Sequence, residues 1–212
     1  AHMKNLEIYI HIPFCVRKCE YCDFLSFPAD DDAKLRYVKG LMAEMIFYGP
    51  LMKNYQVSSV YIGGGTPSSI DEQWIAALME GVFDCFNVLP DAEISIECNP
   101  GTLSREKLLA YRDAGINRLS IGLQSANNDE LKLLGRIHTF EQFVTNYEVA
   151  RNVGFKNINV DLMYGLPGQS ASQYMATVNK IIRLHPDHIS AYSLIVEKGT
   201  PFYEKYKFDM VR

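Results

Sequence analysis

Short β-branched runs alternate with segments of helical periodicity along almost the whole chain. Such runs predict strands, and apolar residues at helical spacing behind a capping residue predict helices. The predicted strands cover residues 6–12, 57–62, 93–98, 118–123, 157–163 and 188–196. The clearest predicted helices cover residues 30–52, 71–86, 104–114 and 170–184. Because strands separated by helices pair in parallel, the sequence predicts an α/β fold around one parallel sheet.

The predicted strands have one apolar face and one polar face. In the third strand Ile94 and Ile96 alternate with Ser95 and Glu97, and most of the other strands repeat the pattern. Parallel strands that are covered on both faces read as nearly continuous apolar runs, so the polar face is expected to line a cavity. A closed eight-stranded barrel has a packed interior instead. The sequence therefore predicts an open six-stranded (β/α)6 partial TIM barrel.

Composition limits the classes of partner. The net charge is −4, and no Lys/Arg-rich run is present, so we expect no nucleic-acid partner. No apolar run reaches the length of a bilayer span and no secretory signal pattern begins the chain, so we expect no membrane span and a cytoplasmic location. Residues 1–3 resemble an expression scar, residues 4–200 are expected to form one domain, and residues 201–212 are expected to begin a C-terminal region that the chain does not finish.

Three of the five cysteines lie together in one predicted loop, as Cys15, Cys19 and Cys22. An odd and clustered set of cysteines does not indicate a disulfide framework. A structural zinc site has four protein ligands, so a loop with three is either incomplete or left open for another ligand. One interpretation is a non-enzymatic zinc module in which His11 or Asp23 completes the site. The other is an open metal site.

Further unusual residues follow the predicted strands at the edge where the cysteines lie. In a parallel β/α array the loops after the strands lie together, and active sites form there. Residues 63–66 read Gly-Gly-Gly-Thr, and Glu97, Gln124 and Asp161 lie at the ends of later strands. The glycines match no nucleotide-binding fingerprint, but they would let backbone amides reach a carboxylate. Inward carboxylates need a ligand or a partner, and ribose hydroxyls are one candidate.

The spacing Cys15-x3-Cys19-x2-Cys22 is that of the radical S-adenosylmethionine (SAM) enzymes. The sequence as a whole resembles the family that contains oxygen-independent coproporphyrinogen III oxidase and the HemW-type haem chaperones. The motifs YIHIPFC, GGGTPS, IECNPGTL, GLQSANNDELKLLGRIHT and DLMYGLPGQS occur in the family's order. The resemblance implies that the three thiolates hold three irons of a [4Fe-4S] cluster, whose fourth iron is left open for SAM. One electron from the reduced cluster would cleave SAM and generate a 5′-deoxyadenosyl radical.

The resemblance also implies which residues contact SAM and flank the cluster. They are Tyr9, Tyr21, Gly64, Gly65, Thr66, Glu97, Gln124, Arg136, Asp161 and Ile195. Residues 64–66 would meet the methionine end, and Glu97 and Asp161 would bind the ribose. Arg136 would face the SAM carboxylate, although a solvated cation at a helix end is an alternative reading of this residue. Ile195, near the end of the sixth strand, would contact the adenosine. No catalytic residue beyond the cluster and SAM ligands is implied.

Two functions within the family are distinguished by the residues after the third cysteine. The oxidase has a further cysteine two places on, whereas this chain reads Cys22-Asp23-Phe24, as in the chaperone branch. The resemblance therefore implies a haem chaperone that binds haem and passes it to a recipient haemoprotein. The alternative is radical oxidative decarboxylation of porphyrinogen propionates, a coproporphyrinogen dehydrogenase activity. An electron donor protein is expected as a further partner. The histidine-containing haem motif of the chaperones does not occur before Arg212.

Overall fold

A single curved sheet organises the part of the chain that a computed structural model describes, residues 3–16, 19–22 and 26–206. Its six described strands follow one another in chain order, and every neighbouring pair is parallel. The strands are β1 (Lys4–Ile12), β2 (Tyr55–Gly64), β3 (Val88–Cys98), β4 (Arg118–Gln124), β5 (Asn157–Tyr164) and β6 (His188–Ser193). Sequential parallel order without closure confirms the predicted open partial barrel.

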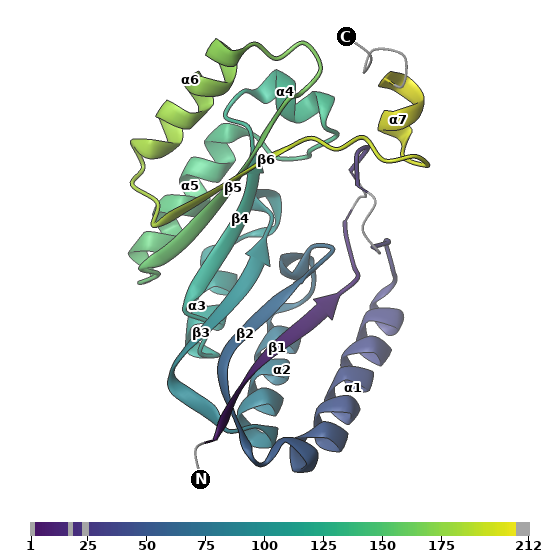
Figure 1. Cartoon of the computed structure of the whole chain (residues 1–212), viewed down its shortest axis with the longest axis vertical. Coiled ribbons are helices and arrows are strands. Elements are labelled where there is room, and N and C mark those ends of the chain that lie inside the picture. The colour runs from purple at the N-terminus through teal and green to yellow at the C-terminus, as the bar shows by residue number, and fades with distance from the viewer. Residues whose placement is uncertain (1–2, 17–18, 23–25, 207–212) are drawn as a thin grey trace.

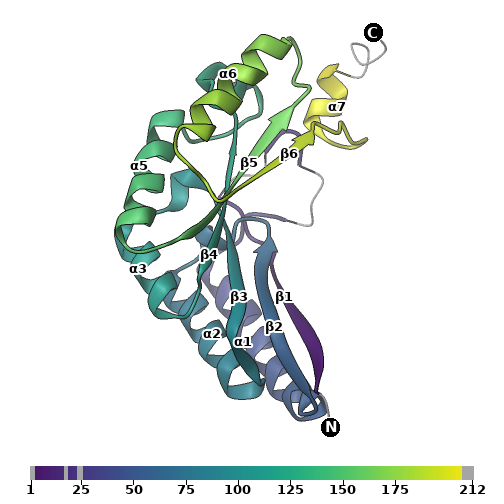
Figure 2. The ribbon, with the colours of Figure 1, turned by 60° about the vertical axis from the view of Figure 1, so that its left-hand side comes forward.

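Helices cover one face of this sheet, as Figures 1 and 2 show, and leave the other face open. The longer ones are α1 (Asp31–Tyr48), α2 (Glu72–Cys85), α3 (Arg105–Asp113), α5 (Phe140–Asn152) and α6 (Ala171–Ile182). Shorter elements are η1 (Gly49–Met52), η2 (Pro67–Ser69), η3 (Pro100–Thr102), α4 (Asn128–Leu133) and α7 (Pro201–Tyr206). Among the residues that the structure describes, none of these helices combines the length and apolar character of a bilayer span.

The helices begin where the sequence supplies capping groups. The side chains of Asp30, Asp71 and Ser104 accept hydrogen bonds from the free amides of the first turns of α1, α2 and α3. Thr139 and Ser170 form capping boxes at the starts of α5 and α6. These caps fix where each helix begins and therefore how long each loop after a strand is.

The core lies between the helices and the apolar face of the strands. Ile96, Leu119, Ile121 and Ile158 are fully buried there, one strand beside the next. Burying one such side chain stabilises the fold by about 1.5–3 kcal/mol. The alternate residues of the same strands point away from the helices, and several of them line a cavity. The alternation in the sequence therefore predicted both faces correctly.

Some element boundaries differ from the sequence prediction. The sixth strand ends at Ser193, not at residue 196, because the Leu194 amide bonds to the Tyr164 carbonyl and the chain then leaves the sheet. The third strand begins at Val88, ahead of Pro90, whose missing amide hydrogen weakens a strand prediction. A register shift follows the pairing of Val57 with Val88, and it accommodates the extra residues.

The short helix α7 contacts the cysteine loop, which we define as the described residues 15–16 and 19–22. Figure 1 shows α7 beside this loop. The Phe202 amide donates to the carbonyl of Glu20 at 3.0 Å. The Phe202 ring is fully buried in a second apolar cluster with Leu134, Met163 and Leu166, against which Tyr21 packs. The chain after β6 therefore holds the cysteine loop in place.

Replacing Phe202 with Ala is expected to release Cys19 and Cys22. Loss of a buried Phe costs about 3–5 kcal/mol, so the segment opens more often and both thiols react about tenfold faster or more. Maleimide labelling of the metal-free protein, followed by mass spectrometry, measures these rates. Tyr203→Ala, at the next position of α7, is the control, and buried Cys98 is the internal reference. Unchanged labelling of both cysteines in Phe202→Ala would contradict the role of α7.

Candidate cofactor site

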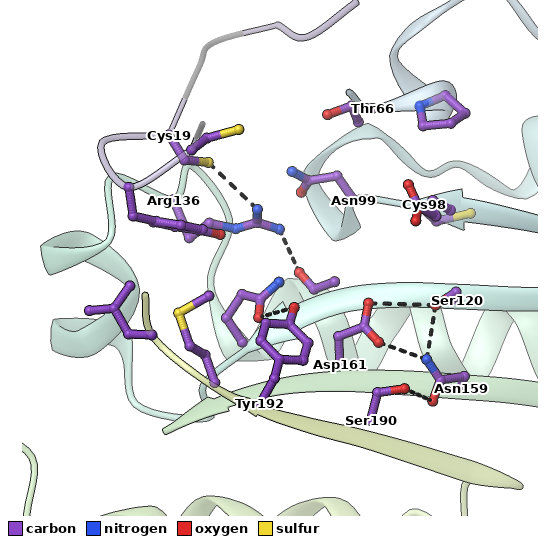
Figure 3. A pocket seen from close by; sticks show the side chains of 18 of the residues that line it. Cys19, Thr66, Cys98, Asn99, Ser120, Arg136, Asn159, Asp161, Ser190 and Tyr192 are labelled. Atoms are coloured by element: carbon purple, nitrogen blue, oxygen red, sulfur yellow. Dashed lines mark hydrogen bonds between the residues drawn. The ribbon is translucent and has the colours of Figure 1, made fainter. Parts of the chain in front are cut away.

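A cavity of about 760 Å³ opens on the polar face of the sheet. Its lining runs from the cysteine loop across β2, β3, β4 and β5 to β6 and the residues after it. A volume of this size is typical of small-molecule and cofactor sites. Figure 3 shows polar side chains from several strands pointing into it. The open face of the partial barrel therefore has a cavity of the size and lining that suit a small-molecule ligand.

The structure brings most of the predicted site residues to this cavity. Those that line it are Cys19, Tyr21, Cys22, Thr66, Glu97, Gln124, Arg136, Asp161 and Ile195. Those that lie outside its lining are Tyr9, Cys15, Gly64 and Gly65. Tyr9 is 59% exposed and stacks on Tyr61, which does line the cavity. Asp23 and Phe24, which distinguish the two branches in the sequence, lie outside the described residues.

Each thiol of the cysteine loop has a different polar neighbour. Cys15 Sγ accepts from Thr66 Oγ1 at 3.5 Å, and Cys19 Sγ accepts from Arg136 Nη1 at 3.6 Å. Cys22 Sγ lies 3.9 Å from Ser26 Oγ. All three are half-buried free thiols. Hydrogen bonds of this kind stabilise sulfur that carries negative charge, whether in a thiolate or in an iron–sulfur centre.

The donor set fits an iron–sulfur cluster with an open position. Three thiols stand on one short loop, and His11, a candidate fourth zinc ligand, shares a 2.9 Å hydrogen bond with Tyr9. Among residues 3–16, 19–22 and 26–206, no three His, Cys, Asp or Glu side chains are grouped around a metal position. The fit to a cluster therefore rests on the chemistry and spacing of the thiols and on the donors beside them. Buried Cys98 is different, because burial and Glu97 raise the pKa of its thiol.

The glycine loop, residues 63–66 at the end of β2, packs against Cys15 and the residues just before it. The Gly65 amide donates to the Ile12 carbonyl at 2.8 Å, and the Thr66 amide donates to the Phe14 carbonyl at 2.7 Å. A Cβ atom on Gly65 would lie 2.7 Å from that Phe14 oxygen and 3.0 Å from Cys15 Sγ. Residue 65 must therefore be glycine, because Phe14 and Cys15 approach it too closely for a side chain. These amides, which the sequence analysis assigned to a ligand carboxylate, are engaged within the protein.

Glu97 points into the cavity and is held by two donors. Tyr61 donates its hydroxyl hydrogen to Oε1 at 2.9 Å, and the Gly64 amide donates to Oε2 at 3.1 Å. Burial raises the pKa of the Glu97 carboxyl, and the two hydrogen bonds act in the opposite direction. Gly64 has φ +118°, a left-handed conformation that favours glycine. The glycine loop therefore contributes one amide to a carboxylate of the protein itself.

Asp161 lies in the cavity one strand beyond β4 and has a similar arrangement of donors (Figure 3). Asn159 Nδ2 donates to Oδ1 at 2.7 Å, and Ser120 Oγ donates to Oδ2 at 3.5 Å. Burial raises the pKa of the Asp161 carboxyl, and these hydrogen bonds oppose that effect. The two carboxylates predicted to bind one ligand therefore face the same cavity.

Arg136 is not the solvated helix-end cation that the sequence left as an alternative. Its Nη1 reaches Cys19, its Nη2 donates to the Gly122 carbonyl, and its Nε is buried without a partner among the described residues. The carbonyl of Gly122 lies where the pairing of β4 with β5 shifts register. Gln124, two residues later, has a left-handed φ of 73°. Burial and the charge of Arg136 lower the pKa of His138 to about 3, so this ring is neutral. Arg136 is therefore a partly buried cation beside the cysteine loop.

Sequence reasoning gave no role to several residues that complete the site. They are Tyr61, Ser120, Asn159, Ser190 and Tyr192, and all of them line the cavity. Tyr192 donates to Gln124 Oε1 at 2.9 Å, and burial raises the pKa of the Tyr192 hydroxyl to about 12. Each lies at an inward position of its strand, two residues from another polar residue. That regular spacing was the available signal.

Comparison with known proteins supports the family resemblance. Residues 9–181 match the Radical SAM superfamily. The chain is 40% identical over 196 residues to "Heme chaperone HemW" of Bacillus subtilis, which covers 92% of this chain and 52% of that protein. Against "Heme chaperone HemW" of Escherichia coli it is 39% identical over 203 residues, covering 93% and 52%. The chain therefore spans about half the length of these relatives.

Solved structures show the same fold. Coproporphyrinogen III oxidase (HemN) from Escherichia coli, described as a radical SAM enzyme, aligns with a TM-score of 0.84 and 32% identity, over 91% of this chain and 44% of that one. SuiB from Streptococcus suis, solved with S-adenosylmethionine bound, aligns with a TM-score of 0.65 and 20% identity, over 94% and 43%. The second likeness concerns the fold alone. Since the family match covers most of the sheet as well as the cysteine loop, the chain belongs to the Radical SAM superfamily.

Proposed function

We propose that the protein holds a [4Fe-4S] cluster on Cys15, Cys19 and Cys22 and binds SAM in the adjoining cavity. The observation that carries this proposal is the placement of a three-thiol loop at the end of a polar cavity that contains two carboxylates. When bound, the cluster would supply one electron for reductive cleavage of SAM. A one-electron donor protein is therefore a proposed partner.

The polarity of the cavity supports one orientation of SAM. Half-buried Arg136, whose Nη1 lies beside Cys19 and whose Nε has no partner among the described residues, suits the SAM carboxylate near the cysteine loop. Glu97 and Asp161 suit the ribose hydroxyls, because carboxylates accept hydrogen bonds without donating any. Ile195 is 65% exposed and lines the cavity beyond β6, where it suits the adenine. Each of these residues keeps the role that the sequence resemblance implied.

Other predicted contacts have a modified role in this proposal. Thr66 and Tyr21 line the cavity next to the cysteines, where they would flank the cluster and the methionine end. Gly64 and Gly65 act by letting the two loops approach, and not as free amide donors. Tyr9 acts through its stacking on Tyr61, with ring centroids 6.3 Å apart, and Tyr61 in turn holds Glu97. Gln124, which accepts from Tyr192, remains a proposed contact to the polar part of SAM.

For the biological role we propose a cytoplasmic haem chaperone that transfers haem to a recipient haemoprotein. The names and identities of the HemW relatives support this role. Coproporphyrinogen oxidation is the second candidate, and the structural similarity to HemN favours it. The two are separated by incubating the reconstituted protein with haem and an apo-haemoprotein, and separately with coproporphyrinogen, SAM and a reductant. Haem transfer without decarboxylation supports the chaperone, decarboxylation supports the oxidase, and failure of both overturns both roles.

Each cysteine of the loop is expected to be necessary for the cluster. Anaerobic reconstitution of the protein with iron and sulfide should give a four-iron centre, whose paramagnetic resonance spectrum in the reduced state changes when SAM is added. Cys15→Ala, Cys19→Ala and Cys22→Ala should each lose that spectrum. Cys85→Ala is the control, because Cys85 lies at the end of α2. A spectrum indifferent to SAM, or a cluster retained after loss of these cysteines, would overturn the assignment.

Asp161→Asn is expected to weaken SAM binding by about tenfold or more, since a hydrogen bond to a charged group contributes about 1.5–3 kcal/mol. Calorimetry on the reconstituted protein measures this change. Asp129→Asn is the matched control, because the Asp129 side chain is 93% exposed. Equal SAM affinity in wild type and Asp161→Asn would show that Asp161 does not bind the ligand.

Asp161→Asn is also expected to change how the stability of the metal-free protein depends on pH. Burial raises the folded-state pKa of Asp161, so the folded protein binds more protons than the unfolded chain between the raised pKa and the ordinary value of about 3.9. The metal-free wild type therefore gains stability as pH falls through the raised pKa, and Asp161→Asn should lack that share of the gain. Urea unfolding between neutral and mildly acidic pH tests this difference. Identical pH dependence in the two proteins would contradict it.

A further inference from the structure

The floor of the cavity contains a chain of hydrogen bonds that ends on Asp161, and Figure 3 shows its members. Ser190 Oγ donates to Asn159 Oδ1 at 3.0 Å. Asn159 Nδ2 donates both to Ser120 Oγ at 2.9 Å and to Asp161 Oδ1 at 2.7 Å. Ser120 Oγ in turn lies 3.5 Å from Asp161 Oδ2. The side chains come from β4, β5 and β6, so the chain of bonds also links three neighbouring strands.

The chemistry of the groups fixes the direction of these bonds. An ionised carboxylate only accepts hydrogen bonds, so the amide nitrogen of Asn159 must face Asp161. The amide oxygen then faces Ser190, whose hydroxyl must donate to it. Asn159 is 2% exposed and Ser120 is 4% exposed, so neither has water as a ready alternative partner. Both oxygens of Asp161 therefore receive a donor from the protein, and the carboxylate also faces the cavity.

Among the described residues, neutral groups donate the hydrogen bonds to Asp161, and the charge of Arg118 acts on it without an ion pair. In the described part of the chain no Lys, Arg or His side chain forms an ion pair with Asp161. Arg118, the neighbouring guanidinium on the floor, contacts Ser95, His188 and Glu93 instead. A direct guanidinium contact would occupy the carboxylate oxygens in a bidentate way. Asp161 is thus oriented without losing its capacity to accept further hydrogen bonds.

We propose that Asn159 is a positioning residue that aims the Asp161 carboxylate at the vicinal hydroxyls of the SAM ribose. This inference rests on the proposed function, because it assumes that SAM occupies the cavity. Asn159 donates to the carboxylate, and it acts through that bond on selectivity for the hydroxyls. Ser190, which orients the Asn159 amide, acts in the same direction with a smaller effect.

The test compares SAM with an analogue that lacks both ribose hydroxyls, 2′,3′-dideoxy-SAM. Affinities are measured by anaerobic calorimetry on the reconstituted protein, with the cluster left oxidised so that SAM is not cleaved. Wild type should prefer SAM by about tenfold or more. Asn159→Asp removes both amide donors at almost unchanged size and places a second carboxylate beside Asp161. It should bind SAM about tenfold more weakly, bind the analogue as wild type does, and lose the preference.

Two further variants keep the test decisive. Asn157→Asp, on the same strand and two residues earlier, adds the same charge four residues from Asp161 and should keep the wild-type preference. Ser190→Ala removes the donor that orients the amide, a hydroxyl that also acts on the Asp161 carboxyl, and should reduce the preference even if Asn159→Asp does not fold. Circular dichroism and urea unfolding establish that each variant is folded.

The outcomes separate this inference from the function on which it rests. A wild type that binds neither compound overturns the proposed SAM site, and the inference falls with it. A wild type that prefers SAM, together with Asn159→Asp and Ser190→Ala variants that keep that preference, overturns only the positioning role. Equal weakening of SAM and of the analogue in Asn159→Asp would also overturn that role, because it indicates general damage to the cavity. Selective loss of the hydroxyl preference supports it.

Discussion

The need to satisfy polar groups on the uncovered face of the sheet governs the rest of the structure. A buried carboxylate without partners costs several kcal/mol, and this open barrel carries two on inner positions of β3 and β5. Glu97 and Asp161 each receive donors from the protein, and each keeps lone pairs toward the cavity. The apolar face of the same strands buries the core against the helices. One alternating pattern therefore supplies both the stability of the fold and the polarity of the site.

The cysteine loop depends on contacts with segments distant in the sequence. The glycine loop after β2 packs against it, the Arg136 guanidinium donates to Cys19, and the chain after β6 bonds to Glu20 through Phe202. A loop that carries three thiols has few apolar groups with which to order itself. The cysteine loop is therefore ordered by contacts with these distant segments and not by apolar packing of its own. The same contacts place the thiols at the end of the cavity.

The parts of this structure that depend on local periodicity could be predicted from the sequence, and those that depend on long-range contacts could not. Strand faces and helix starts follow from spacing and caps. Ile195 lies beyond β6 because the turn there depends on the distant Tyr164 carbonyl. The role of Arg136 stayed ambiguous because its hydrogen-bond acceptor, the Gly122 carbonyl, lies beside Gln124. The left-handed conformation of Gln124 is not indicated by residue propensities. Asn159 carried a visible signal, its inward position, but its partners lie on other strands.

The distribution of charge in the cavity follows from how the polar groups are paired. The guanidinium of Arg136 contacts a thiol and a carbonyl, and that of Arg118 contacts groups on the floor, so among the described residues neither forms an ion pair with the two central carboxylates. The cavity therefore has a cationic end at the cysteine loop and an acidic middle. A ligand with a carboxylate at one end, and a sulfonium and hydroxyls further along, matches that order of charges in one direction only. Because neutral donors hold the carboxylates, the cavity keeps its order of charges and can select one orientation of the ligand. Ion pairs would have cancelled that order of charges.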